Sequence, residues 1–149
     1  EHVASIAAYA HDTGLPNLLP PARLDVLEQP WEVSSVDVIF CANMIHIAPW
    51  TCAQALVAQA ARALKAGGQL VLYGPFRVDG AHTSESNEAF HASLRSQDPD
   101  WGVRDLEAVD ALARAAGLES EERFAMPANN QIVTWRRSTE VEGSASGES

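Results

Sequence analysis

The sequence predicts an α/β fold in which a mostly parallel sheet is covered by helices. A short strand expected at 23–27 carries an acid, and a nearly continuous apolar strand follows at 36–41. This second strand leads into a helix at 53–64, and a double glycine then starts a third strand at 69–73. Continuous apolar strands are typical of parallel sheets, and a strand, a helix and a strand in direct succession indicate a right-handed crossover between parallel neighbours.

The N-terminal segment predicts a helix followed by a short strand. Apolar residues recur at helical spacing over 2–13, and Gly14 supplies a stop signal. The proline pair at 20–21 confines the next strand to about 23–27, because proline tolerates only the start or the edge of a sheet strand.

The predicted helix at 53–64 carries an apolar stripe about one helix face wide. Gly67 stands where a left-handed helix cap is expected, so the double glycine is interpreted as a helix stop.

Two further helices and two strands are expected in the second half of the chain. One helix is predicted at 84–97 and another at about 105–116, with Asp105 as its cap and Gly117 as its stop. The strands are expected at 121–126 and 131–136, which brings the expected total to five.

Composition indicates one soluble domain at 1–137 and a disordered acidic tail at 138–149, where Ser, Gly and Glu dominate. The net charge of −10 argues against a nucleic-acid surface, which needs clustered Lys and Arg. The two cysteines and five histidines show no metal-ligand spacing, and no apolar run is long enough to span a membrane. We therefore expect a cytoplasmic protein with a small-molecule or protein partner and no metal.

Several ordered motifs give the pattern a family resemblance. The order of strands, helix and double glycine resembles the distal half of a class I S-adenosylmethionine-dependent methyltransferase, a Rossmann-like doubly wound sheet. More narrowly, residues 1 to about 137 resemble a methyltransferase-like family of unknown function. The motifs are Asn43-Met44-Ile45-His46-Ile47, Tyr73-Gly74-Pro75-Phe76, Ser86-Asn87, Asp98-Pro99-Asp100-Trp101-Gly102-Val103-Arg104-Asp105 and Met126-Pro127-Ala128-Asn129-Asn130.

The resemblance implies that the last strand is antiparallel and that S-adenosylmethionine is the cofactor of the complete protein. Such families begin with a strand and a glycine-rich turn that hold the methionine end of the cofactor, followed by a strand whose terminal acid holds the ribose. Neither is found ahead of the strand expected at 23–27. We therefore expect a truncated sequence that holds only the adenine edge and the substrate rim and is inactive alone.

The resemblance and the rule that ligands bind at the carboxyl ends of parallel strands select the candidate site residues. Asp25 is expected to accept a hydrogen bond from the adenine amino group, with the Val26 amide free to meet a ring nitrogen; the alternative is a turn aspartate. Asn43 and Met44 are expected near the cofactor, where the methyl donor and acceptor would meet. His46 either lines the same site or is a buried structural group.

The substrate rim is expected to combine side chains from separate loops. Tyr73 and Arg77 leave the strand at 69–73, whereas Asn129 and Asn130 follow the strand at 121–126. For the two asparagines, turn chemistry and substrate contact are equally open, because Asn tolerates left-handed conformations.

The sequence leaves open the role of the segment 98–105 and allows two functions other than methyl transfer. The segment 98–105 could form a lid or a structural clasp between Arg and Asp. The chain could also be a non-catalytic interaction module whose open sheet edge pairs with another strand, including that of a second copy. A nicotinamide-dependent dehydrogenase shares the sheet, but the motifs after residue 98 give it no support.

Overall fold

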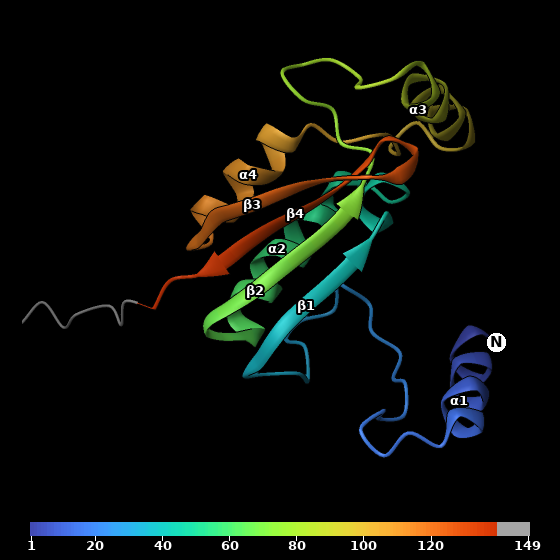
Figure 1. Ribbon diagram of the computed structural model, residues 1–149, viewed down its shortest axis with the longest axis vertical. Coiled ribbons are helices and arrows are strands. Elements are labelled where there is room, and N and C mark those ends of the chain that lie inside the picture. Colours follow the sequence, from blue (N-terminus) through green and yellow to red (C-terminus); the bar gives the residue numbers. More distant parts are fainter. Residues whose placement is uncertain (140–149) are drawn as a thin grey trace, which may run out of the picture.

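The computed structural model describes residues 1–139, which contain one mixed sheet of four strands (Figure 1). The strands are β1 (Val36–Ala42), β2 (Leu64–Gly74), β3 (Leu118–Met126) and β4 (Asn130–Arg137), in the spatial order β1-β2-β4-β3. β1 and β2 are parallel, whereas β4 is antiparallel to both of its neighbours, β2 and β3. The predicted parallel pair and the antiparallel last strand are therefore confirmed.

The expected fifth strand, at 23–27, does not form. The Asp25 carboxylate accepts a hydrogen bond from the Leu27 amide at 3.0 Å, and the Asp25 carbonyl accepts one from the Glu28 amide at 3.1 Å, so the segment closes into a turn. A strand exists only when a neighbour pairs with its backbone groups. Since β1 is the edge strand of the described sheet, this segment has no such neighbour.

The four expected helices are confirmed, with two short 3-10 helices in the loops. Residues 140–149 of the expected tail lie outside the described part of the chain, and no described helix is long and apolar enough to cross a membrane. The helices are α1 (His2–Thr13), α2 (Trp50–Ala63), α3 (Glu85–Gln97), α4 (Leu106–Ala115), η1 (Met44–His46) and η2 (Pro127–Asn129).

The junction between α2 and β2 differs from the prediction of a glycine-capped helix. α2 ends at Ala63, and the already extended Leu64 pairs with Val36 of β1, so the chain passes directly from helix to strand. Gly67 does have a positive φ of 78°, but it lies inside β2, where the register shifts. Gly68 is needed for close approach, because a Cβ there would lie 2.9 Å from the Lys65 carbonyl oxygen.

One face of the sheet carries the core, and α2 and α4 lie behind it in Figure 1. Alternate residues of the strands, including Leu70, Leu72 and Trp135, are at most 2% exposed against these helices. The indole of Trp135 also donates a hydrogen bond to the Asp110 carboxylate at 2.9 Å, which anchors α4 to β4. The apolar faces of the helices and the alternate apolar residues of the strands thus pack into a single core.

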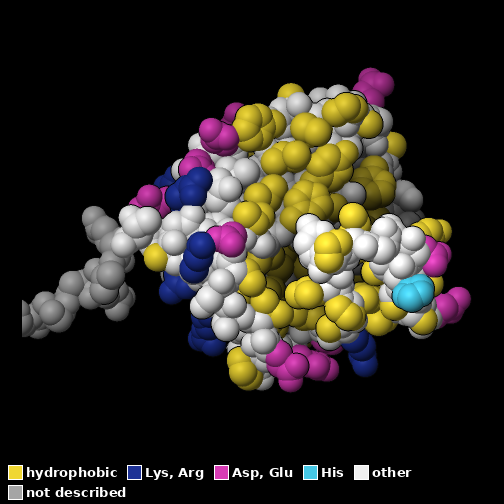
Figure 2. Space-filling model, turned by 60° about the horizontal axis from the view of Figure 1, so that its bottom comes forward, with side chains coloured by type: hydrophobic (Ala, Val, Ile, Leu, Met, Phe, Trp, Pro, Cys, Tyr) yellow, Lys and Arg dark blue, Asp and Glu magenta, His cyan; other side chains and the backbone are white. Residues whose placement is uncertain are grey.

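The opposite face of the sheet is largely uncovered. Val38 and Phe40 on β1 are 52% and 59% exposed, and no residue of α1 is buried. Figure 1 shows α1 apart from the sheet, and Figure 2 shows hydrophobic side chains gathered into one large patch on the face turned toward the viewer. Exposed apolar patches of this kind mark surfaces that other molecules cover.

Candidate functional site

An open pocket of about 540 Å³ lies where β1 and β2 end. The carboxyl ends of these parallel strands, the turn between β3 and β4, and α3 lie together at the upper right of Figure 1. This is the edge at which open α/β sheets bind ligands. We call it the carboxyl-end pocket; its lining residues are Asn43, Ile47, Pro75, Ser86, Asn87, Phe90, Ala128 and Asn130.

Asn43 enters the pocket directly after β1. Its φ of 61° is left-handed, and its amide donates a hydrogen bond to the Tyr73 carbonyl at 2.9 Å. Asparagine tolerates this conformation better than most residues, which accounts for its place at the sharp exit from the strand. Within the described residues the Asn43 carboxamide has no hydrogen-bond partner, so its donor and acceptor remain available to a ligand.

The turn between β3 and β4 supplies the opposite wall. Ala128 and Asn129 are both left-handed, with φ values of 60° and 59°. Asn129 therefore has a turn role and does not line the carboxyl-end pocket, whereas Asn130 does. The Asn130 carboxamide donates to the Pro127 carbonyl at 3.3 Å, which leaves its oxygen free. Both asparagines line a second pocket of about 400 Å³ together with Arg123, and Asn130 alone lines both pockets.

Asn87 lines the pocket, although the sequence motif Ser86-Asn87 had given it no predicted role. It is 4% exposed, and its side chain donates hydrogen bonds at 3.0 Å to Thr83 and to the Asn129 carbonyl. Its amide is capped by the Ser84 hydroxyl at 3.1 Å. Asn87 therefore ties the start of α3 to the β3–β4 turn; the Ser84 cap was the available signal for the start of the helix.

His46 lies beneath the pocket rather than on its rim, because its side chain is 0% exposed. Its Nδ1 accepts a hydrogen bond from the Arg104 amide at 3.0 Å, and its carbonyl accepts one from the Gly102 amide at 2.9 Å. Its ring also contacts Phe76 edge to face, with centroids 5.0 Å apart. The structural alternative for His46 is the one that these contacts support.

The hydrogen bonds also assign the protonation of His46. Burial first, and the positive charge of Arg104 second, lower the pKa of His46 to about 3, so the ring is neutral near neutral pH. Since Nδ1 is an acceptor, the single proton is assigned to Nε2. Nε2 faces Gly74, where an added Cβ would lie 2.4 Å away. Nε2 is buried and has no hydrogen-bond partner within the described residues, so His46 offers no free lone pair to a proton.

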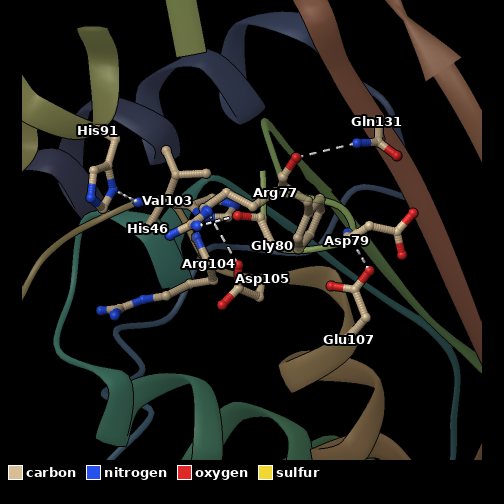
Figure 3. A network of polar contacts seen from close by, with 11 residues as sticks. His46, Arg77, Asp79, Gly80, His91, Val103, Arg104, Asp105, Glu107 and Gln131 are labelled. Carbon is tan, nitrogen blue, oxygen red and sulfur yellow. Dashed lines mark hydrogen bonds and ion pairs between the residues drawn. The ribbon is translucent and has the colours of Figure 1, made fainter. Parts of the chain in front are cut away.

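The contacts of Arg104, which lies beside His46 in Figure 3, favour a clasp over a lid for the segment 98–105. Its guanidinium donates to the carbonyls of Ile45, Ala48 and Asp100 at 2.9, 2.7 and 2.7 Å, and it lies 5.6 Å from the Trp50 ring centroid. The clasp thus joins this segment to η1 through backbone carbonyls. The Arg to Asp ion pair of this segment is made instead by Asp105 with Arg77.

Arg77 and Asp105 belong to the same structural network. Arg77 donates to the Gly80 carbonyl at 2.6 Å, and its Nε lies 3.3 Å from the Asp105 carboxylate. Asp105 is the residue before α4, as expected, but its side chain makes no capping hydrogen bond. Neither Arg77 nor Tyr73, which pairs with Ala42 and Ile132 in the sheet, lines the carboxyl-end pocket.

The residues predicted to contact the adenine, Asp25 and Val26, do not line the carboxyl-end pocket. Asp25 lines a separate pocket of about 560 Å³ formed by the segment 22–33, and its turn hydrogen bond uses Oδ1. Met44 is partly buried against the core. Of the four predicted cofactor residues, only Asn43 therefore lines the carboxyl-end pocket, and Val26 lines neither of these two pockets.

The carboxyl-end pocket is electrically neutral in its lining, which contains no Asp, Glu, Lys, Arg or His. No group of three potential metal ligands is found among residues 1–139. The arrangement can therefore position a ligand through carboxamides and apolar contacts.

Comparison with known proteins decides the family. Residues 1–137 match a family described as DUF938, a protein of unknown function. The chain belongs to the DUF938 family. The narrower resemblance, to a family of unknown function over residues 1 to about 137, is thereby confirmed.

Solved structures show what fold this DUF938 chain shares. It is similar to an O-methyltransferase family protein from Burkholderia thailandensis, with 19% identity, a TM-score of 0.76 and coverage of 93% of this chain and 41% of that one. An O-methyltransferase family 2 protein from Planctomyces limnophilus in complex with apigenin gives 23% identity, a TM-score of 0.75 and coverage of 91% and 41%. Human N-acetylserotonin methyltransferase in complex with SAM is also similar, with 15% identity and a TM-score of 0.65; the match covers 79% of this chain and 33% of that one.

These likenesses establish the fold of the DUF938 chain and its extent. The four-stranded sheet resembles part of a methyltransferase Rossmann-like domain. The chain spans about 41% of the length of the Burkholderia and Planctomyces proteins.

Proposed function

We propose that this chain is the acceptor-binding part of an S-adenosylmethionine-dependent methyltransferase. The observation that carries the proposal is the carboxyl-end pocket, which lies at the ends of a parallel strand pair where such folds bind ligands. Structural relatives support the cofactor: one is described in complex with SAM and another with sinefungin and meleagrin. The proposed acceptor is a small molecule or a protein side chain, met in the cytoplasm.

Asp25 and Val26 are the residues proposed to meet the adenine end of the cofactor. The Asp25 carboxylate is exposed, and its second oxygen has no partner within the described residues, so it can accept a hydrogen bond from an adenine amino group. The Val26 amide would meet a ring nitrogen, and Asn43 and Met44 would lie nearer the methyl group. No glycine-rich turn lies before β1 in the sequence, so we expect weak binding by these residues alone.

The proposed reaction makes modest demands on this chain. A bound S-adenosylmethionine supplies an electrophilic methyl group on a sulfonium, and direct displacement requires chiefly alignment and a dry site. Asn43, Asn130 and Phe90 would orient the acceptor in the pocket. His46 would hold the floor and would not remove the acceptor proton, because its Nδ1 already accepts from the Arg104 amide.

Titration of the chain with S-adenosylmethionine, followed by two-dimensional amide NMR, tests the proposal. We expect saturable shifts confined to Asp25, Val26, Asn43 and Met44, with dissociation constants on the order of a millimolar. Asp25→Asn should weaken the effect, whereas Asp12→Asn on α1 is the matched control. Shifts elsewhere, or no shifts, would reject a cofactor role for these residues; micromolar binding would reject the proposal that they hold only part of the site.

A second candidate is an interaction module that pairs through the edge of β1. The supporting observation is that β1 is an edge strand with Val38 and Phe40 exposed beside that edge. Unpaired backbone groups on an edge are a template for another strand, including that of a second copy. Sedimentation velocity separates the candidates, because a discrete complex supports edge pairing and a monomer at all concentrations contradicts it.

A further inference from the structure

The chemistry of the carboxyl-end pocket is defined by side chains that are polar but uncharged. Carboxamides are contributed by three separate parts of the chain: the exit of β1, the first turn of α3 and the β3–β4 turn. Ser86 adds a hydroxyl that shares a 3.0 Å contact with the Ser84 hydroxyl. The apolar part of the lining includes Ile47 and Phe90, which are 45% and 38% exposed and offer flat contact surface.

Three basic side chains, those of Arg104, Arg77 and His91, are held by contacts of their own. The Arg104 guanidinium is held by three backbone carbonyls, and Arg77 by the Gly80 carbonyl and Asp105. His91 on α3 accepts a hydrogen bond at Nδ1 from the Val103 amide at 3.0 Å. The residues that line the pocket carry no charge that could neutralise a charged ligand.

All three carboxamides retain unused hydrogen-bonding capacity. The Asn43 side chain keeps both its donor and its acceptor, and Asn130 keeps its acceptor oxygen while its NH₂ group donates to the Pro127 carbonyl. Asn87 uses its NH₂ group to hold the turn, so its oxygen alone is left. A free carboxamide pairs best with a group that presents a donor and an acceptor side by side.

We infer that the carboxyl-end pocket selects an uncharged planar molecule that carries an amide-like edge, with a hydrogen-bond donor next to an acceptor. The inference rests on the proposed function, in that this molecule would be the methyl acceptor. A charged group in this open pocket gives up part of its hydration and gains no counter-charge from the lining, whereas a neutral amide exchanges water for Asn43 and rests its flat face on Phe90. Carboxylates, phosphates and ammonium groups are disfavoured by the same argument.

A matched set of aromatic probes tests this inference on the complete 149-residue chain without any cofactor. Benzamide, benzoate and benzylammonium have similar size and shape and differ in charge. We expect benzamide to shift the side-chain amide signals of Asn43 and Asn130 saturably. Benzoate and benzylammonium should bind at least about tenfold more weakly at the same signals.

A charge exchange gives the complementary variant. Asn43→Asp keeps the size and the tolerance for a left-handed backbone but replaces the neutral carboxamide with a carboxylate. We expect the variant to bind benzylammonium in preference to benzamide. Asn17→Asp, in the segment before β1 and outside the pocket, makes the same change in net charge and should leave the order of the probes unchanged.

The outcomes separate this inference from the proposed function. Equal or tighter binding of benzoate or benzylammonium by the unmodified chain would overturn it, and so would the absence of benzamide shifts at the pocket signals. Selective benzamide binding together with no response to S-adenosylmethionine would instead reject the methyltransferase and keep the neutral pocket. The two titrations are therefore read independently on one sample.

Discussion

At the scale of single residues, His46 shows how a neighbour distant in sequence decides chemical behaviour. The sequence placed a histidine after an apolar strand and left open whether it lines a site or is structural. The deciding contact is the hydrogen bond from the Arg104 amide to Nδ1, across 58 positions of the chain. Sequence spacing carries no information about that contact, so the buried tautomer could not be predicted.

The buried neutral state of His46 predicts a pH-dependent stability. The pKa of about 3 in the folded state is below the ordinary value of 6.5, so the unfolded state binds more protons between these pH values. The stabilisation is thus complete above pH 6.5 and is lost as the pH falls toward 3. Lowering the pH from 7 to 4.5 should cost about 2 to 3 kcal/mol of the free energy of unfolding.

Urea denaturation at several pH values, with His46→Asn as the comparison, isolates this contribution. The asparagine oxygen can still accept from the Arg104 amide but does not titrate in this range. The variant should therefore show a shallower loss of stability between pH 6.5 and 4.5, while the other histidines contribute equally to both proteins. Parallel pH profiles would contradict the assignment of a buried neutral His46.

At the scale of elements, α3 is held over the pocket by one buried side chain. Asn87 donates to both Thr83 and the Asn129 carbonyl and is 4% exposed. α3 buries few other residues, chiefly Leu94 toward its far end. The start of the helix should therefore depend on this carboxamide more than on apolar packing.

Asn87→Ala should loosen the first turn of α3 without unfolding the sheet. The substitution leaves the Asn129 carbonyl without its donor, at a cost of about 1 to 3 kcal/mol. Hydrogen exchange should accelerate at the amides of 87–90, while the amides of β2 and β4 stay protected. Ser96→Ala, at an exposed site of the same helix, is the control. Equal acceleration in both variants, or in neither, would show that Asn87 is not the tie.

Helices and strands that a local apolar pattern specifies could be predicted from the sequence. Each wrong prediction has a physical cause. The stripe at 53–64 and the apolar run at 36–41 specify α2 and β1, because each carries its own period. The segment 23–27 also contains apolar residues, but a strand needs a partner as well, and Asp25 closes a turn in the absence of one. Gly67 has the left-handed φ expected of a helix cap, but it lies inside β2, because the pairing of Val36 with Leu64 starts the strand before it.

The candidate site was predicted by location better than by residue. The carboxyl-end rule brought Asn43 and Asn130 to one pocket, as expected. Arg77 was drawn into contacts with Gly80 and Asp105, and Asn129 into a left-handed turn, because each found a partner that a loop sequence does not reveal. Asn87 and Phe90 reached the pocket from a helix whose direction depends on the fold.

At the scale of the whole molecule, the described chain is covered on one sheet face and open on the other. α2 and α4 bury one face, whereas the other presents Val38 and Phe40, and α1 buries none of its residues. The patch in Figure 2 belongs to a chain with a net charge of −10, so general repulsion opposes contact between copies. Self-association should therefore grow with salt concentration if the edge of β1 drives it.

Replacing one exposed phenylalanine with lysine tests which part of this surface mediates self-association. Phe40→Lys places a charge beside the edge of β1, and charges there block strand pairing. The variant should be monomeric in sedimentation velocity at concentrations where the unmodified chain associates. Phe124→Lys is the matched control, because Phe124 is 47% exposed on the opposite edge strand, β3. If both variants lose association, the whole apolar face is the contact; if neither does, pairing through β1 is wrong.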